Sequence, residues 1–301
     1  MVHSRFSKRI CVLALWFVLG NASAADFTFA AFGDTPYSAE EEKSFPLLIA
    51  EMNREKLTFV VHIGDLKAAW MPCSDELFRQ RREWFDLFHH PFVFIPGDNE
   101  WTDCRQRRAG SHDPLERLGK LRELFAQGGE SLGQRRIRLA RQSKDYPEHA
   151  RWRHEGVEFM TLNAPGGANN ARADPKEHRV RNAAGIRWLE ETFKIARQDK
   201  LRAIVVMMHA NPWASPSSHY FGYRDLIAAL EKETRAFKGE VLLVHGDTHR
   251  YRVDNPLRDA KGGPLANFTR VEVFGYPTMN WVRIRVGEEA GRIRFAVTPG
   301  N

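Results

Sequence analysis

Acidic and histidine side chains follow five of the apolar runs in this sequence, at the end of each run or a few residues beyond it. These groups are Asp34, Asp65, Asp98-Asn99-Glu100, His209 and Asp247-Thr248-His249. Carboxylate, amide and imidazole donors without sulfur suit Mn, Fe, Zn or Mg ions. Several carboxylates held together would repel one another unless cations lay among them. The sequence therefore predicts a metal-binding site.

A glycine stands directly before four of the acidic residues, in the pairs Gly33-Asp34, Gly64-Asp65, Gly97-Asp98 and Gly246-Asp247. Glycine allows the chain to turn sharply out of a strand, and it leaves room for close approach to an ion. One Gly-Asp pair after a strand is more often only a turn or a helix cap. The ordered repetition of such sites at successive strand ends favours a metal site over unrelated turns.

The apolar runs are rich in β-branched and aromatic residues, and they alternate with helical patterns. We expect strands at Phe27–Phe32, Thr58–Ile63, Phe92–Ile95, Val157–Leu162, Ala203–Met208 and Val241–Val244. We expect helices at Ala39–Asn53, Ser74–Phe88, Leu115–Phe125, Gly185–Arg197 and Tyr223–Phe237. The alternation predicts an α/β fold. Ligands of open α/β sheets bind outside the carboxyl ends of the strands, so the predicted metal ligands should converge there.

Three parts of the chain lack this alternation. The tail has three strand-like runs separated by glycine-containing turns, which predict an antiparallel meander: Thr269–Phe274, Trp281–Val286 and Arg292–Val297. Residues 165–181 contain paired glycines and asparagines and indicate a loop. The arginine-rich residues 134–153 indicate a solvated surface segment. With no Ser- or Pro-rich linker and no internal repeat, residues 25–301 are predicted to form a single domain.

The first 24 residues have the pattern of a secretory signal peptide. Three basic residues precede the apolar run Ile10–Leu19, which leads into Ala22-Ser23-Ala24. The run is shorter than the roughly 20 residues that a membrane-spanning helix needs. We therefore expect cleavage near Ala25, export to the periplasm or secretion, and no stable membrane span after signal removal. A retained leader acting as an anchor is the alternative.

The predicted export bears on the cysteines. Cys11 lies in the leader, which leaves Cys73 and Cys104 as an even pair. In an oxidising compartment such a pair predicts a disulfide. Two free buried thiols or a soft-metal pair are the alternatives. A bridge would fasten the segment after Asp65 to the segment after Asn99.

The order of the motifs resembles that of the calcineurin-like metallophosphoesterases, whose pattern is D-x-H, GDxxD, GNH(D/E), H and GHxH. The matching segments are Asp34, Gly64-Asp65, Pro96-Gly97-Asp98-Asn99-Glu100, His209 and Gly246-Asp247-Thr248-His249. The resemblance covers about residues 26–286, and the set is more specific than any single motif. It implies a four-layer α/β/β/α sandwich of two mixed sheets, with a two-metal site at the strand ends.

The resemblance also implies how the ligands divide between the two metal ions. The bridging ligand would be Asp65. The first metal would be held by Asp34 and His249. The second metal would be held by Asp98 or Asn99, His209 and Asp247. Two metals about 3.5 to 4 Å apart clamp a phosphate and activate a water that attacks phosphorus, so no serine or cysteine nucleophile is needed.

The sequence departs from the family pattern at three positions. Pro36 stands where D-x-H has its histidine, so the first metal loses a ligand, and Ala68 stands at the last position of GDxxD. Asp247 replaces the first histidine of GHxH, which a metal tolerates because a carboxylate also binds hard and borderline ions. The two metal positions are therefore predicted to be unequal. Water or a nearby group such as Tyr37 would have to complete the first.

The third motif permits two alignments. A gapless match puts Asp98 at the ligand asparagine and Asn99 at the family's catalytic histidine. A shift by one residue keeps Asn99 as the ligand and places Glu100 at the histidine position. The shifted alignment is preferred, because it leaves an ionisable catalytic group to assist the leaving oxygen. The candidate phosphate contacts that flank the motifs are His62, Lys67 and Arg250, whose plainer role would be solvation of the surface.

The predicted function is metal-dependent hydrolysis of a phosphate ester in a small phosphorylated substrate. The formal net charge is +7, and without the three basic residues of the leader the predicted mature chain carries +4, a mild bias that favours an acidic substrate. Basic and acidic residues are interspersed, so the sequence lacks the polybasic arm typical of a nucleic-acid binder. The alternative is a metal- or ligand-binding extracytoplasmic protein on the same fold, because Pro36 and the missing histidine weaken catalysis.

Overall fold

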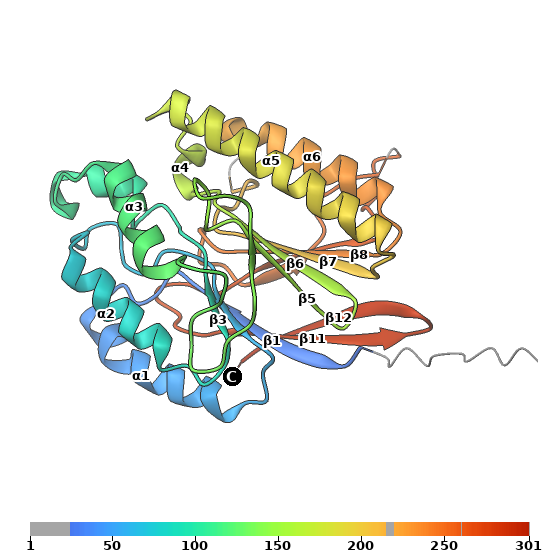
Figure 1. Cartoon of the computed structure of the whole chain (residues 1–301), viewed down its shortest axis with the longest axis horizontal. Coiled ribbons are helices and arrows are strands. Elements are labelled where there is room, and N and C mark those ends of the chain that lie inside the picture. Colours follow the sequence, from blue (N-terminus) through green and yellow to red (C-terminus); the bar gives the residue numbers. More distant parts are fainter. Residues whose placement is uncertain (1–24, 215–219, 260, 301) are drawn as a thin grey trace, which may run out of the picture.

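The computed structural model describes residues 25–214, 220–259 and 261–300. Its elements form four layers, with two sheets packed face to face and helices on both outer faces (Figure 1). The predicted α/β/β/α sandwich of two mixed sheets is therefore confirmed. The predicted signal peptide lies outside the described residues. None of the described helices is long and apolar enough to cross a membrane.

The five-stranded sheet has the order β12-β11-β1-β2-β3. Its strands are β1 (Phe27–Phe32), β2 (Val60–His62), β3 (Phe92–Phe94), β11 (Val282–Glu289) and β12 (Arg292–Pro299). Strands β1, β2 and β3 are parallel, while β11 runs antiparallel to both β1 and β12. The helices on its outer face are α1 (Ala39–Arg54), α2 (Asp75–Asp86) and α3 (Pro114–Phe125). Helices α1 and α2 begin at serine caps, Ser38 and Ser74.

The seven-stranded sheet has the order β4-β5-β6-β7-β8-β10-β9. Its strands are β4 (Ala140–Arg141), β5 (Ala150–His154), β6 (Val157–Leu162), β7 (Ala203–Met208), β8 (Glu240–His245), β9 (Arg252–Asp254) and β10 (Phe268–Glu272). Strands β6, β7, β8 and β10 are parallel to one another. The long helices on its outer face are α5 (Pro175–Gln198) and α6 (Arg224–Ala236). The connecting segments hold α4 (Gly166–Asn169) and the short 3₁₀ turns η1 (Thr102–Arg105), η2 (Arg107–Ala109) and η3 (Tyr220–Gly222).

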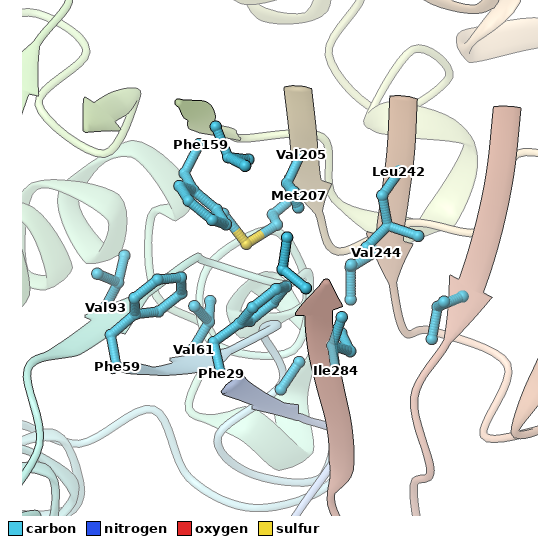
Figure 2. Packing of buried hydrophobic residues seen from close by; sticks show 14 of the residues in the cluster. Phe29, Phe59, Val61, Val93, Phe159, Val205, Met207, Leu242, Val244 and Ile284 are labelled. Carbon is cyan, nitrogen blue, oxygen red and sulfur yellow. The ribbon is translucent and has the colours of Figure 1, made fainter. Parts of the chain in front are cut away.

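The core between the sheets is apolar. Phe29 and Val61 of the five-stranded sheet face Phe159, Val205 and Met207 of the other sheet (Figure 2). Successive side chains of a strand point to opposite faces, so the next residues along β1 and β2 pack against the helices instead. Burial on both faces explains why these strands are continuous apolar runs in the sequence.

The tail does not form the predicted meander. Strand β10 joins the seven-stranded sheet beside β8 and β9, whereas β11 and β12 pair in the five-stranded sheet. The chain crosses between the sheets over residues 273–281, and the N–H of Tyr276 donates to the carbonyl of Asp34 there (3.0 Å). Strand-like runs in sequence order do not specify their partners, because pairing depends on which sheet edge is open.

Two further expectations were wrong. Residues 165–181 are not one loop, because α4 forms at their start and α5 begins at Pro175, with Asp174 accepting a hydrogen bond from the N–H of Glu177 as its cap. Residues 134–153 are not a solvated segment throughout, because they include β4 and part of β5. The Trp152 side chain of β5 is buried between the sheets, where it stacks on Phe159.

The predicted disulfide is present. Cys73 and Cys104 are bonded, with their Cα atoms 5.7 Å apart. Both side chains are buried. The bond joins the loop that follows Asp65 to η1, which follows the Asp98 loop. It therefore fastens together two of the loops that carry predicted metal ligands.

Candidate metal centre

Five strands bring polar residues to one region from their carboxyl ends. Asp34, Asp65 and Asp98 follow β1, β2 and β3 of the five-stranded sheet, and His209 and Asp247 follow β7 and β8 of the other sheet. Metal-competent atoms of these residues lie within 4.8 Å of one another in two groups. The structure thus brings together residues that the sequence predicts as ligands, from both sheets.

The two groups share a histidine. One group contains Asp34, Asp65 and His209, and the other contains Asp98, His209 and Asp247. The imidazole therefore stands between two pairs of carboxylates. Two groups of donor atoms that share one residue lie close enough together to suit two neighbouring cations.

Four predicted metal ligands have a strained, left-handed backbone conformation. Asp34, Asp65, Asp247 and His249 have φ values of 53°, 57°, 81° and 59°. Such left-handed conformations are uncommon for residues other than glycine, and they persist where the surrounding structure enforces them, typically at functional sites. The turn out of each strand thus aims the side chain at the centre.

Glycines leave room for the ligands, as the sequence predicts. A Cβ atom at Gly64 would lie 2.6 Å from Nδ1 of His209, and one at Gly97 would overlap the Asp65 carboxylate. Only a residue without a side chain lets the loops approach so closely. Substitution at either position would push a ligand out of place.

The His209 imidazole is oriented for a metal. Its Nδ1 lies 2.8 Å from the carbonyl oxygen of Ile63. A carbonyl can only accept, so Nδ1 carries the proton, and Nε2 offers a lone pair in the neutral ring. Nε2 is buried, 3.1 Å from Oδ1 of Asp98 and 3.4 Å from Oδ1 of Asp65, without hydrogen-bond geometry to either. An orphaned imidazole nitrogen among carboxylate oxygens fits a cation.

His249 is oriented in the same way as His209, with Nδ1 at a backbone carbonyl and Nε2 near a carboxylate. Its Nδ1 lies 2.8 Å from the carbonyl oxygen of Tyr276, and its Nε2 lies 3.4 Å from Oδ1 of Asp34. Histidines that bind metals commonly donate their second N–H to a backbone carbonyl, which fixes the tautomer and the ring. The pairing of Asp34 with His249 agrees with the ligand set predicted for the first metal.

The electrostatics of the site favour bound cations. In the described part of the chain, none of Asp34, Asp65, Asp98 and Asp247 forms an ion pair with a lysine or arginine. Burial raises the pKa of Asp65 well above its usual range, and the charges of Asp98 and other nearby carboxylates add to the shift. Burial and the Asp98 charge raise the pKa of Asp247 to about 7. Gathering these carboxylates is costly unless positive charge is supplied.

The geometry favours the gapless alignment of the third motif. Asp98 lies in the group with His209 and Asp247, with its Oδ1 3.1 Å from Nε2 of His209. The Asn99 amide nitrogen instead donates to the hydroxyl of Tyr37 (2.8 Å). A turn can move its side chains by one position without changing the flanking strand, so the sequence alone could not choose between the alignments.

Glu100 lies beneath the ligand loops. Its Oε1 accepts from the backbone N–H of Gly97 (2.5 Å) and of Asp65 (3.1 Å), and the residue is fully buried. Burial raises the pKa of this carboxyl. The side chain therefore ties together the turns that carry Asp65 and Asp98.

The candidate phosphate contacts occupy different environments. His62 is fully buried, accepts from the N–H of Gly64, and lies 3.2 Å from the carbonyl oxygen of Thr35, so it supports the turns at Asp34 and Asp65. Lys67 is buried, and its Nζ donates to the carbonyl of Ala68 (3.1 Å). Burial lowers the pKa of Lys67 to about 8, although nearby carboxylates oppose the shift. The third candidate, Arg250, is exposed.

Two positioning residues were not predicted from the sequence. The N–H of Gly166, at the start of α4, donates to Oδ1 of Asp98 (3.0 Å). The N–H of Asn211 donates to Oδ2 of Asp247 (2.9 Å). Asn211 stands two residues after His209, and this closeness to a predicted ligand is a sequence signal that could have identified it. Gly166 gave no such signal, because its loop has no periodic pattern.

Comparisons with known proteins identify the family. The sequence matches the calcineurin-like phosphoesterase family over residues 27–251. NAD nucleotidase of Haemophilus influenzae is similar in structure, with 14% identity and a TM-score of 0.46 over 92% of this chain and 56% of that one. Vacuolar protein sorting 29 of Cryptosporidium parvum has 12% identity and a TM-score of 0.31 over 91% of this chain and 98% of that one. No curated protein sequence matches the chain. The chain belongs to the calcineurin-like phosphoesterase family.

Proposed function

We propose that this protein hydrolyses a phosphate ester in a small phosphorylated substrate, with divalent cations at the candidate metal centre. The observation that carries the proposal is the orientation of His209. A backbone carbonyl binds its Nδ1–H, so Nε2 faces Asp65 and Asp98. This arrangement suits metal coordination, because the unpartnered Nε2 lies among carboxylate oxygens and a bound cation would satisfy both the nitrogen and the carboxylates.

The residues of the centre would hold the ions in two sets. Asp34 and His249 would serve one ion, and Asp98, His209 and Asp247 the other, with Asp65 between them. Bound cations would polarise the phosphoryl group and lower the pKa of a water. In the overall reaction the water oxygen bonds to phosphorus, the bond from phosphorus to the alcohol oxygen breaks, and one water proton ends on the alcohol.

Other residues act through these ligands. Glu100 is proposed as a positioning residue, because its Oε1 accepts hydrogen bonds from the backbone of two turns that carry proposed ligands. His62 has the same role at the Asp34 and Asp65 turns. Lys67 supplies positive charge close to Glu100 and Asp65.

A second candidate is metal or ligand binding without turnover. Its support is specific, because Pro36 offers no imidazole and the Asn99 amide is bonded to Tyr37. In the gapless alignment, Asn99 stands at the position of the family's catalytic histidine, so that position has no ionisable side chain.

We also propose export of the mature protein from residue 25, which the Cys73–Cys104 disulfide supports.

The test combines turnover with metal content. Metal-free protein would be loaded separately with Mn²⁺, Zn²⁺, Mg²⁺ and Fe²⁺, and phosphate release would be followed on a panel of phosphate monoesters and diesters. The proposal expects turnover that appears only with metal. Asp98→Ala should lose bound metal, whereas Asn99→Ala should keep it. Metal binding without turnover on the whole panel would favour the second candidate, and absence of metal binding would contradict both.

A further inference from the structure

Three aromatic side chains gather beside the first ligand set: Tyr37, Trp70 and Tyr276, hereafter the aromatic cluster. The rings of Tyr37 and Tyr276 stack, with centroids 5.9 Å apart and planes 23° apart. Trp70 meets both edge-on, at 6.0 Å from Tyr37 and 6.4 Å from Tyr276. The ring of Trp70 is 49% exposed and Tyr276 is 36% exposed, whereas Tyr37 is buried. The cluster therefore presents aromatic surface to solvent.

The aromatic cluster is joined directly to the metal centre. The hydroxyl of Tyr37 donates to Oδ2 of Asp65 (2.7 Å), and its ring lies 5.3 Å from the His249 imidazole. The backbone of Tyr276 binds both members of the first set, because its N–H donates to Asp34 and its carbonyl accepts from His249. A phosphate held at the centre would thus have its ester group within reach of the cluster.

The loops that carry the exposed rings are held in place. Trp70 lies between Ala68 and the disulfide-bonded Cys73, in a turn closed by the N–H of Met71 donating to the carbonyl of Ala68 (3.0 Å). The start of the same loop is bound by Nε of Arg81, which donates to the carbonyl of Leu66 (3.0 Å). Holding an exposed tryptophan in this way lowers the entropy lost when a ligand packs on it.

An exposed aromatic surface next to a phosphate site suits a flat ring in the substrate. Aromatic rings stack in offset or edge-to-face contacts that stabilise the pair beyond simple burial. Stacking of one nucleobase on a protein side chain raises affinity by roughly tenfold or more, largely independently of the base. An aliphatic ester group would gain only from apolar burial.

From these contacts we infer that the aromatic cluster is a subsite for a flat aromatic ring in the alcohol part of the phosphate ester, such as a nucleoside or an aryl group. The inference rests on the proposed function, since the phosphate is taken to bind at the metal centre. It assigns Trp70 and Tyr276 as specificity-determining residues, through binding of the ring.

Turnover of a matched pair of substrates tests the inference. AMP and ribose 5-phosphate release the same kind of primary alcohol and differ by the base. Wild-type protein should have a kcat/KM for AMP about tenfold higher, mostly through KM. Trp70→Ala should remove that advantage and leave ribose 5-phosphate within about twofold of wild type. Leu87→Ala is the control, because Leu87 is exposed to the same degree (50%) at the end of α2.

Binding of phosphonates tests the subsite without turnover, because their carbon–phosphorus bond is not an ester. In calorimetric titrations of metal-loaded protein, phenylphosphonate should bind about tenfold more tightly than methylphosphonate. Trp70→Ala and Tyr276→Leu should each reduce that ratio. A ratio near one in the wild type, or equal losses for both ligands in Trp70→Ala, would overturn the subsite. Hydrolysis of ribose 5-phosphate tests the proposed function separately.

Discussion

The hydroxyl of Tyr37 lies 2.7 Å from Oδ2 of Asp65 and donates a hydrogen bond to it. The same hydroxyl accepts from the amide of Asn99 (2.8 Å), and the Tyr37 side chain is buried. Burial and the neighbouring carboxylates raise the pKa of Tyr37 well above its usual value, so the phenol is neutral. Tyr37 therefore orients the carboxylate of Asp65, the proposed bridging ligand, as a hydrogen-bond donor and is a poor candidate for the missing metal ligand.

Tyr37→Phe should destabilise the protein. The change leaves the Asn99 amide without its acceptor in a buried site, which costs about 1 to 3 kcal/mol. Chemical denaturation of metal-free protein measures the loss. Tyr251→Phe is the control, because its ring stacks on Phe274 outside the metal centre. Equal stability of Tyr37→Phe and wild type would show that this hydrogen bond is not formed in solution.

The two metal positions should differ in affinity. Besides Asp65, one side of the centre has Asp98, His209 and Asp247, while the other has Asp34 and His249. Pro36 has no donor to complete the weaker side. Purification in mild chelator should leave about one ion per chain, counted by elemental analysis, and added metal should restore the second. Two ions released in parallel during a chelator titration would contradict the unequal ligand count.

Metal binding should compete with protons at His209. Burial alone would lower the pKa of His209, but the charges of Asp65, Asp34 and Asp98 hold it well above its usual value. The metal-free imidazole is therefore protonated near pH 7, and an ion must displace that proton. Calorimetric titration in two buffers of different ionisation enthalpy should detect at least one proton released on metal binding, from His209 with a further share from Asp247, and affinity should fall as pH is lowered. Binding without proton release would contradict this protonation state of the metal-free imidazole.

His149 should make the fold sensitive to acid. The residue is fully buried, and burial lowers its pKa from 6.5 to about 4. Because the unfolded chain binds the proton more tightly, its contribution to stability is complete above pH 6.5 and is lost as pH falls toward 4. Between pH 7 and pH 5 the loss is about 2 kcal/mol. His149→Gln should lose less free energy of unfolding over that range than the exposed-site control His89→Gln, and equal slopes would refute the assignment.

The sequence predicts the ligand-bearing strands well, because they are buried on both faces. The run Ala203–Met208 is a strand with the predicted bounds, and His209 follows it. Gly-Asp turns at parallel strand ends then bring the ligands together, whatever the loops between them do. The family resemblance adds how the ligands divide between ions.

Features set by three-dimensional contacts were harder to predict. The choice between Asp98 and Asn99 depends on one residue of register in a turn. The partner of β10 depends on which sheet edge lies open to it. The N–H of Gly166 reaches Asp98 only because α4 begins there, and the run Gly167–Asn170 adopts left-handed conformations that have no periodic signal in sequence.

The most direct test of the account compares metal content and phosphate release in wild type and Asp65→Ala. We propose that Asp65 is shared by the two ligand sets, so its loss should affect the whole centre. Elemental analysis and a phosphate assay would be run on the same preparations, with Asp86→Ala of α2 as a surface control. We expect Asp65→Ala to lose metal and hydrolysis together while the control keeps both. Full metal content and normal turnover in Asp65→Ala would contradict the placement of the centre.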